Sequence, residues 1–331
     1  MNNKTFKFIF NIFFKTILVL KRIFINFIRT LKTILTLMKF NFNKISTIIL
    51  GGFIIASCNG SADKNEIDKD VLDPNSSINT NFDGKLFSIP SPIQISLLLK
   101  QANIPFNESL LNQTDKSKNY TTEYLQALNL GIYGTDLGYA SINEQNGISL
   151  KYLSVVEGLT SKLGLEGAFD KNFMSRFEKY HTNKDSIMGI ISDAFRKGDN
   201  FLKNAKRKST SSLILAGGWI ESINFACKLN SIKENQNIIN RIGEQQQTLT
   251  SLIDILVEYN TNNSNDVLIA DLNELKTIYE KVVIDYQFVA PKTDEAKKET
   301  TLQHTYKVKI EKEVLAEIES KISAIRAKIT N

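Results

Sequence analysis

Apolar residues recur at steps of three and four along most of the chain from about residue 90 onward, the spacing that places side chains on one face of an α-helix. The clearest stripes are Leu150, Leu153, Val156, Leu159 and Leu163; Leu249, Leu252, Ile253, Leu256 and Val257; Leu268, Leu272, Leu275, Tyr279 and Val282; and Ile310, Val314, Ile318, Ile322, Ile325 and Ile329. Because an amphipathic helix is stabilised mainly by burying its apolar face, each stripe needs a partner surface. The sequence therefore predicts an all-α fold, a multi-helix bundle or array of about eight helices.

Polar and glycine-containing segments divide these helices. Asn146-Gly147 and Gly164 are typical of helix ends, and the polar runs at residues 182–185 and 261–265 are typical of connections. Residues 290–305 form one long irregular segment, in which residues 301–308 alternate like a short strand, although an isolated strand would be poorly stabilised. Residues 90–331 could form one core or two fused helical halves, and we expect one helical domain because no linker divides them.

The charge of the chain is distributed unevenly. Its formal charge is +6, but residues 1–57 contain nine Lys or Arg and no Asp or Glu. The remainder has 32 basic against 35 acidic residues, a formal charge of −3. A mildly acidic domain without a basic stripe has no net attraction for phosphate backbones, so the sequence argues against nucleic-acid binding.

Residues 38–57 have the organisation of a secretory signal peptide: Met38, a short basic stretch, and thirteen uncharged residues before Cys58. Ile55-Ala56-Ser57-Cys58 resembles the lipobox of bacterial lipoproteins. The resemblance implies cleavage before Cys58 and a Cys58 thiol carrying diacylglycerol, with acyl chains such as palmitate as the membrane anchor. The alternative is an uncleaved transmembrane helix, for which thirteen residues are short because a bilayer span needs about twenty.

The segments on either side of this signal differ in composition. Residues 1–37 are apolar but interrupted by basic residues, which suggests a mis-assigned upstream start, with translation beginning at Met38. The alternatives are an extended basic n-region and an amphipathic helix on the membrane surface. Residues 58–89 are rich in Asn, Asp, Ser, Lys and Gly, and this composition predicts a flexible tether. Pro90 and Pro92 then mark the beginning of the first helix.

Three blocks, residues 91–93, 127–140 and 215–221, resemble segments of uncharacterised all-helical lipoproteins of Bacteroidetes bacteria. The resemblance covers most of residues 90–331. It implies a location in the cell envelope and brings no activity with it. Surface-exported lipoproteins of these bacteria often carry acidic residues directly after the lipidated Cys; residues 59–63, Asn-Gly-Ser-Ala-Asp, depart from that pattern and favour an outer-membrane lipoprotein that faces the periplasm.

Two of these blocks contain glycines inside a helical pattern. Gly131, Gly134 and Gly138 fall on one helix face, and Gly217-Gly218 could supply a similar smooth surface on another helix. A glycine inside a helix costs about 1 kcal/mol relative to alanine, so a physical reason is expected for each. The glycines predict either close packing of two helices or room for a ligand.

Polar and aromatic residues accompany these glycines: Tyr133, Asp136 and Tyr139 in one block, Trp219 and Glu221 in the other. If the two helices pair, two carboxylates with aromatic neighbours converge, a composition that serves sugar or cation binding and acid–base chemistry. The alternative interpretation is a hydrogen-bonded core in which Asp136 accepts from a tyrosine. The sequence thus gives a possible ligand pocket and no assigned catalytic residue.

Other kinds of site find little support. His181 and His304 have no companion ligand at a suitable spacing, so we expect no metal site. The sequence has no glycine-rich loop of the kind that binds phosphate, so we expect no nucleotide cofactor. We expect Cys227 to be a small buried side chain. The sequence favours an envelope domain that binds a partner protein or small ligand, or has a structural role. The alternative is an enzyme that acts on envelope carbohydrate through Asp136 and Glu221.

Overall fold

The computed structural model of the chain describes residues 78–82, 85–89, 92–168, 173–180, 182–294, 299–301 and 305–331. These residues form ten α-helices and little sheet, which confirms the all-α prediction. The number exceeds the predicted eight because α5 and α8 have only eight residues each, too few for a clear apolar repeat. The helices are α2 (Pro92–Gln101), α3 (Glu123–Ile142), α4 (Asn146–Lys162), α5 (Phe173–Tyr180), α6 (Lys184–Asn204), α7 (Lys208–Ile232), α8 (Gln236–Gly243), α9 (Gln245–Glu258), α10 (Asp266–Tyr279) and α11 (Lys312–Thr330).

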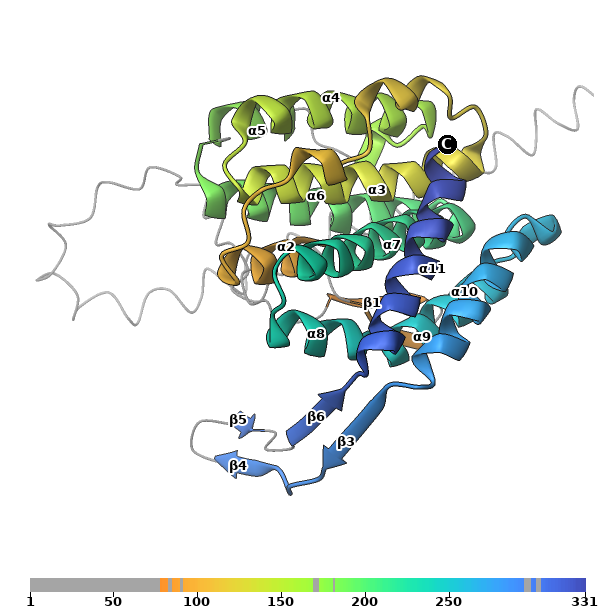
Figure 1. The fold of residues 1–331 in the computed structure, drawn as a ribbon. Coiled ribbons are helices and arrows are strands. Elements are labelled where there is room, and N and C mark those ends of the chain that lie inside the picture. Colours follow the sequence, from red (N-terminus) through yellow and green to blue (C-terminus); the bar gives the residue numbers. More distant parts are fainter. Residues whose placement is uncertain are drawn as a thin grey trace, which may run out of the picture. The chain divides into compact units, whose positions relative to one another are not determined.

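Helices α3 and α7 lie side by side and are surrounded by the others (Figure 1). Residues 127–142 of α3 and 216–227 of α7 are buried without interruption. A helix that is apolar or small on all sides is stable only when neighbours cover all of them, and α2, α4, α6 and α11 contact α3. Neither these two nor any other described helix combines the length and apolar character that a bilayer crossing requires.

The helix ends follow the polar segments of the sequence, with one exception. Gly164 adopts a left-handed conformation (φ 64°) directly after α4, and Asn183 caps α6 by accepting a hydrogen bond from the backbone N–H of Ser186 at 2.9 Å. Asn146-Gly147 does not end a helix, because α4 begins at Asn146. Glu144, at φ 61°, makes the turn after α3, so the glycine is not needed there.

Helix α11 packs against α7 and α10 (Figure 1). Its stripe of Val314, Ile318, Ile322, Ile325 and Ile329 is buried, as its spacing predicts. Burial of each of these side chains stabilises the folded state by about 1.5–3 kcal/mol. The stripe therefore fixes which face of α11 meets the core.

Strands β1 (Ile78–Phe82) and β2 (Lys85–Ile89) form an antiparallel hairpin, in which Thr80 lies opposite Phe87. This hairpin occupies part of the segment for which the composition predicts a flexible tether, residues 58–89. The strands satisfy each other's backbone hydrogen bonds, and β2 contacts α9, which offsets the entropy of ordering. The predicted signal peptide, Cys58 and the remainder of the tether lie outside the described residues.

A second antiparallel ribbon joins α10 to α11. Strand β3 (Val283–Gln287) pairs with β6 (Thr305–Lys309), and β4 (Lys292–Asp294) pairs with β5 (Glu299–Thr301) farther along. Of the residues 301–308 that alternate in the sequence, Thr305 onward form β6, whose partner is β3, while Thr301 ends β5 and residues 302–304 lie outside the described residues. Strand β3 was not predicted from the sequence, because Val283 directly follows the apolar stripe of the preceding helix and extends it.

Candidate functional site

Two glycines allow α3 and α7 to approach closely. A Cβ added at Gly131 would lie 2.1 Å from the carbonyl oxygen of Ile214, and one added at Gly217 would lie 1.9 Å from the carbonyl oxygen of Leu128. Both obstacles are backbone atoms, so a side chain at either position would force the helices apart. The hydroxyl of Thr135 lies 3.0 Å from the carbonyl oxygen of Gly131 in its own helix and 3.3 Å from that of Gly218 in α7, so its one hydrogen is shared between the two helices. The other glycines noted in the sequence, Gly134, Gly138 and Gly218, are buried in the same two helices.

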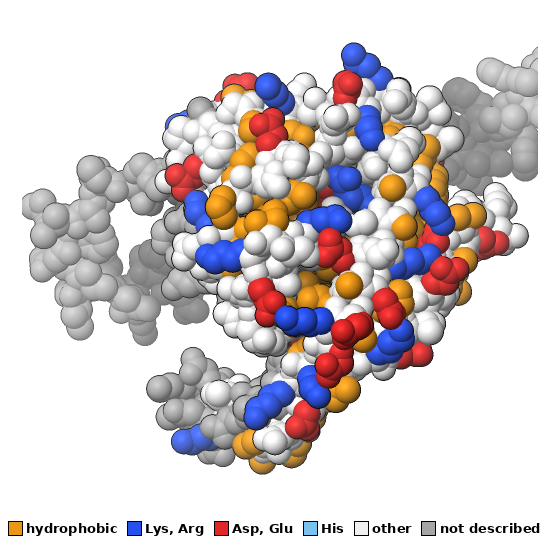
Figure 2. Space-filling model, in the orientation of Figure 1, with side chains coloured by type: hydrophobic (Ala, Val, Ile, Leu, Met, Phe, Trp, Pro, Cys, Tyr) orange, Lys and Arg blue, Asp and Glu red, His pale blue; other side chains and the backbone are white. Residues whose placement is uncertain are grey.

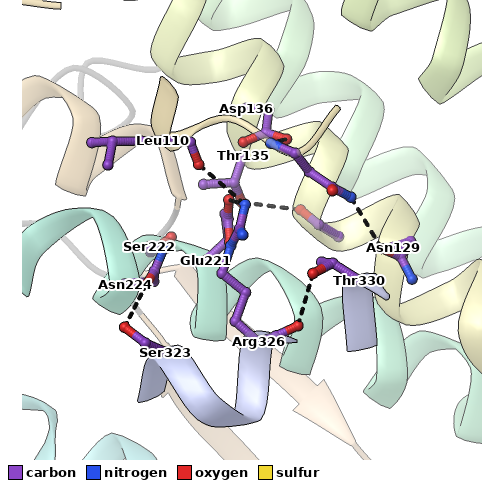
Figure 3. Close-up of polar contacts among 12 residues, drawn as sticks. Leu110, Asn129, Thr135, Asp136, Glu221, Ser222, Asn224, Ser323, Arg326 and Thr330 are labelled. Atoms are coloured by element: carbon purple, nitrogen blue, oxygen red, sulfur yellow. Dashed lines mark hydrogen bonds and ion pairs between the residues drawn. The ribbon is translucent and has the colours of Figure 1, made fainter. Parts of the chain in front are cut away.

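Two carboxyl groups and one guanidinium meet beside this contact (Figure 3). Glu221 of α7 accepts hydrogen bonds from Nε and Nη2 of Arg326, a residue of α11, the second at 2.7 Å. Nη2 of Arg326 also donates to the carbonyl oxygen of Leu110 at 3.1 Å. Asp136 of α3 accepts from the backbone N–H of Asn112 at 3.2 Å. Asp136 and Glu221 are both 0% exposed, whereas the Arg326 side chain keeps 18% of its surface exposed, so both carboxyl groups are buried and the guanidinium lies at the edge of the core.

The surroundings of Asp136 favour its protonated form. Burial, and after it the neighbouring Glu221 carboxylate, raises the pKa of Asp136 well above its usual value. Its Oδ1 finds no conventional donor, but a proton on that oxygen lets Asp136 donate a hydrogen bond to Glu221. The cluster then consists of one carboxylic acid, one carboxylate and one guanidinium, and its net charge is zero. This neutral arrangement is the one that a buried site tolerates.

The three aromatic residues of the predicted pocket are also buried, and each has a partner inside the protein. The hydroxyl of Tyr133 donates to the carbonyl oxygen of Gln113 at 2.6 Å, and the hydroxyl of Tyr139 accepts from the backbone N–H of Asn107 at 3.1 Å. Nε1 of Trp219 donates to the side-chain oxygen of Gln245 at 3.1 Å. Their polar atoms are therefore used internally and do not line an open cleft.

The structure thus brings together two of the five predicted pocket residues, but they do not line a pocket. Asp136 and Glu221 converge, as pairing of the two glycine helices predicts, but inside a filled core. Asp136 accepts from a backbone N–H rather than from a tyrosine. A buried carboxyl pair of this kind can hold one proton and orient three helices, and its chemistry is closed to molecules in solution.

A line of polar side chains extends from this cluster to the end of α11. Nδ2 of Asn129 donates to the carbonyl oxygen of Ile329 at 3.0 Å. The hydroxyl of Tyr120 donates to the carbonyl oxygen of Thr330 at 3.3 Å. The last carbonyl groups of a helix have no partner within the helix. Buried side chains of α3 and of the segment before it supply the missing donors, which fixes the end of α11 in the core.

Sequence reasoning missed Arg326 and Asn112, the residues that complete the cluster. Arg326 lies 105 positions after Glu221, so no local pattern connects them. One signal was available: Arg326 stands beside Ile325 in the stripe of an otherwise well-patterned helix, and a long basic side chain next to a buried stripe implies an acidic partner.

A shallow groove of about 280 Å³ lies elsewhere, between the beginnings of α3 and α10 and the end of α11. Tyr124, Val267, Ile325 and Asp271 are among its lining residues. Burial raises the pKa of Asp271, but hydrogen bonds from Lys328 and Lys321 outweigh this effect and hold the pKa below its usual value. Because the Asp271 carboxylate is already paired with Lys321 and Lys328, it is not available to bind a charged ligand in the groove.

The described residues offer neither a metal site nor a reactive thiol. Within the described ranges, no three His, Cys, Asp or Glu side chains come together in a way that could hold a metal ion. Cys227 is buried in α7, and burial raises the pKa of its thiol, which disfavours the reactive thiolate. His181, His304 and Cys58 lie outside the described residues.

Comparison of the chain with protein-family models, with curated proteins and with solved structures finds no match. The resemblance to helical lipoproteins of Bacteroidetes therefore stays a prediction from the sequence.

Proposed function

We propose that the chain is an envelope lipoprotein, anchored through acyl chains on Cys58, whose helical unit acts by binding or as a structural element rather than by catalysis. The observation that carries the anchor is the order of features before Cys58: a basic stretch, thirteen uncharged residues and Ile55-Ala56-Ser57. Several acyl chains on one cysteine hold a protein on a bilayer far more firmly than one. The composition of residues 59–63 favours the outer membrane and its periplasmic face.

The burial of the carboxyl pair supports a non-enzymatic role. The alternative function, hydrolysis of envelope carbohydrate, requires Asp136 and Glu221 to reach a glycosidic bond. Both side chains are fully buried, and Glu221 is occupied by Arg326. Substrate access would need α3, α7 and α11 to separate, which would strand an ion pair and expose their apolar faces. A partner protein of the envelope or a small ligand that binds the surface fits this unit better, and its acidic charge argues against nucleic acid.

Metabolic labelling with an alkyne analogue of palmitate tests the anchor in the full chain. The wild-type chain should incorporate the label, fractionate with membranes and yield a mature N-terminus at Cys58 by mass spectrometry. Cys58→Ala should lose the label, whereas Cys227→Ala is the matched control and should keep it, because Cys227 is buried in α7. A wild-type chain that retains residues 1–57 and carries no label would rule out the proposal.

A further inference from the structure

Strand β3 and the two residues that follow it concentrate exposed apolar side chains. Of the nine large apolar residues that are exposed in the described part of the chain, five lie within residues 283–289: Val283, Ile284, Tyr286, Phe288 and Val289. Tyr286 is 55% exposed and Phe288 71% exposed. Figure 2 shows hydrophobic side chains gathered at the bottom of the view, where β3 leads toward β4. Scattered apolar residues are normal on a protein surface, but a contiguous group marks an interaction site.

The backbone of β3 is available on one side. Among the described strands, β3 is hydrogen-bonded only to β6, in a sheet of two strands. Helix α8 lies against β6, and the residues of β3 are all exposed. An apolar strand at the edge of a sheet is a template for another strand, and proteins usually protect such an edge with charges, proline or a covering element. In this ribbon, Pro291 stands beyond the apolar residues and does not interrupt them.

Residues 283–289, which are β3 and the two residues after it, have a sequence that is complementary to itself, and the pairing requires Phe288 and Val289 to extend the strand. When two copies are aligned antiparallel about a two-fold axis at Tyr286, Ile284 lies opposite Phe288 of the second copy, and Val283 lies opposite Val289. Asp285 then lies opposite Gln287, so no like charges face each other. A register centred one residue earlier would place Asp285 opposite Asp285, which is destabilising. Only a two-fold interface makes the same patch serve both copies.

From this geometry we infer that β3 is a dimerisation strand, which pairs antiparallel with β3 of a second copy of the chain in the register centred on Tyr286. The two ribbons then form one four-stranded sheet in the order β6-β3-β3-β6. Main-chain hydrogen bonds supply affinity, and the apolar pairs supply register. A lipid surface suits the ribbon less well, because a strand edge has backbone groups that hydrocarbon cannot satisfy. The acidic and basic residues of the ribbon also nearly balance, so it offers little attraction for anionic lipid.

Disulfide cross-linking of the full chain in intact cells, with diamide as the oxidant, tests this pairing. Tyr286→Cys places both thiols at the two-fold axis, where directly opposed Cβ atoms lie about 4.5–5.5 Å apart, near the range of a disulfide. The matched control is Val267→Cys on α10, which is 70% exposed and outside the ribbon. We expect at least about tenfold more disulfide-linked dimer from Tyr286→Cys, because pairing raises the effective thiol concentration.

Two further chains test the register in the Tyr286→Cys background. Ile284→Asp combined with Phe288→Asp places carboxylates opposite each other and should reduce the cross-link to the level of Val267→Cys. Ile284→Lys combined with Phe288→Asp places a cation opposite an anion at the same positions and should restore it. Because the wild-type side chains are exposed, far-UV circular dichroism should show unchanged helix content in both chains.

Several outcomes would overturn the inference. Equal cross-linking of Tyr286→Cys and Val267→Cys would indicate random collision, and a cross-link only to another protein would make that protein the partner. A cross-link that survives the two aspartates, or that the Lys–Asp combination does not restore, would exclude this register.

Discussion

The contact between α3 and α7 and the β3–β6 ribbon handle polar and apolar groups in opposite ways. In the helix contact, two carboxyl groups are buried, and each is matched by a neighbour: Glu221 by Arg326, and Asp136 by the backbone N–H of Asn112 in a setting that raises its pKa. In the ribbon, large apolar side chains lie where water does reach them. The first region is complete within one chain, and the second is not. This difference suggests that the core sets the fold and that the ribbon is where the molecule meets something else.

The largest effect is expected from Arg326→Met. Removing the guanidinium leaves Glu221 buried without its partner, and breaking a buried pair in this way typically costs about 3–5 kcal/mol of unfolding free energy. Lys281→Met is the control, because Lys281 pairs with Glu317 on the surface and should cost less than about 1 kcal/mol. Urea unfolding at neutral pH measures both. Equal losses in the two variants would mean that the Glu221–Arg326 pair behaves like an ion pair on the surface.

Gly217→Ala should be next in size. The added methyl would overlap the carbonyl oxygen of Leu128, so the helices must separate, and we expect a loss of about 2–3 kcal/mol. Gly158→Ala is the matched control, since Gly158 lies within α4 and a Cβ there meets nothing within 4 Å. The control should gain about 0.5–1 kcal/mol from better helix propensity. Unfolding curves that change in the same direction for both glycines would contradict the close contact.

Asp136→Asn should have a smaller effect that depends on pH. An amide can donate to Glu221 as the carboxylic acid does, so we expect a loss below about 1 kcal/mol at pH values below about 4, where the carboxyl group is protonated in both the folded and the unfolded protein. Because the pKa of Asp136 is raised on folding, the native state binds the proton more tightly than the unfolded state, and this contribution is lost as pH rises above the ordinary value near 4.

The wild-type protein should therefore lose stability relative to Asp136→Asn as pH rises, by up to about 1.4 kcal/mol per unit, until the raised pKa is reached. Thermal unfolding of both proteins across a pH series isolates this difference, because all other groups are shared. A stability difference that grows in favour of the wild-type protein with rising pH would show that Asp136 is ionised in the native state.

The smallest effect is expected in the ribbon. Phe288→Ser should change the unfolding free energy of the dilute protein by less than about 0.5 kcal/mol, because Phe288 is largely exposed. Phe225→Ala, in the core of α7, should cost about 3–5 kcal/mol and provides the contrast. A large loss for Phe288→Ser would mean that the ribbon contributes to the core of its own chain.

The sequence predicted the features that depend on neighbours in the chain. The stripe of α11 and the caps at Gly164 and Asn183 follow from spacing and from single residue types. Even the convergence of Asp136 and Glu221 could be anticipated, because their distances from the glycines place them on helices that meet. What could not be predicted was the third helix that covers the two carboxyl groups, since Arg326 is remote in sequence and its partner depends on how α11 crosses α7. The same limitation applies to β3, whose partner strand comes only after the β4–β5 segment.

The position of Arg326 in the chain has a consequence for how the molecule assembles. During synthesis α3 and α7 emerge well before α11, and until α11 docks, the acid on α7 has no base beside it. Until then, water solvates the Glu221 carboxylate, so α3 and α7 can associate but cannot exclude all water from the surface between them. Complete dehydration of the centre therefore requires a segment that lies 105 residues farther along the chain.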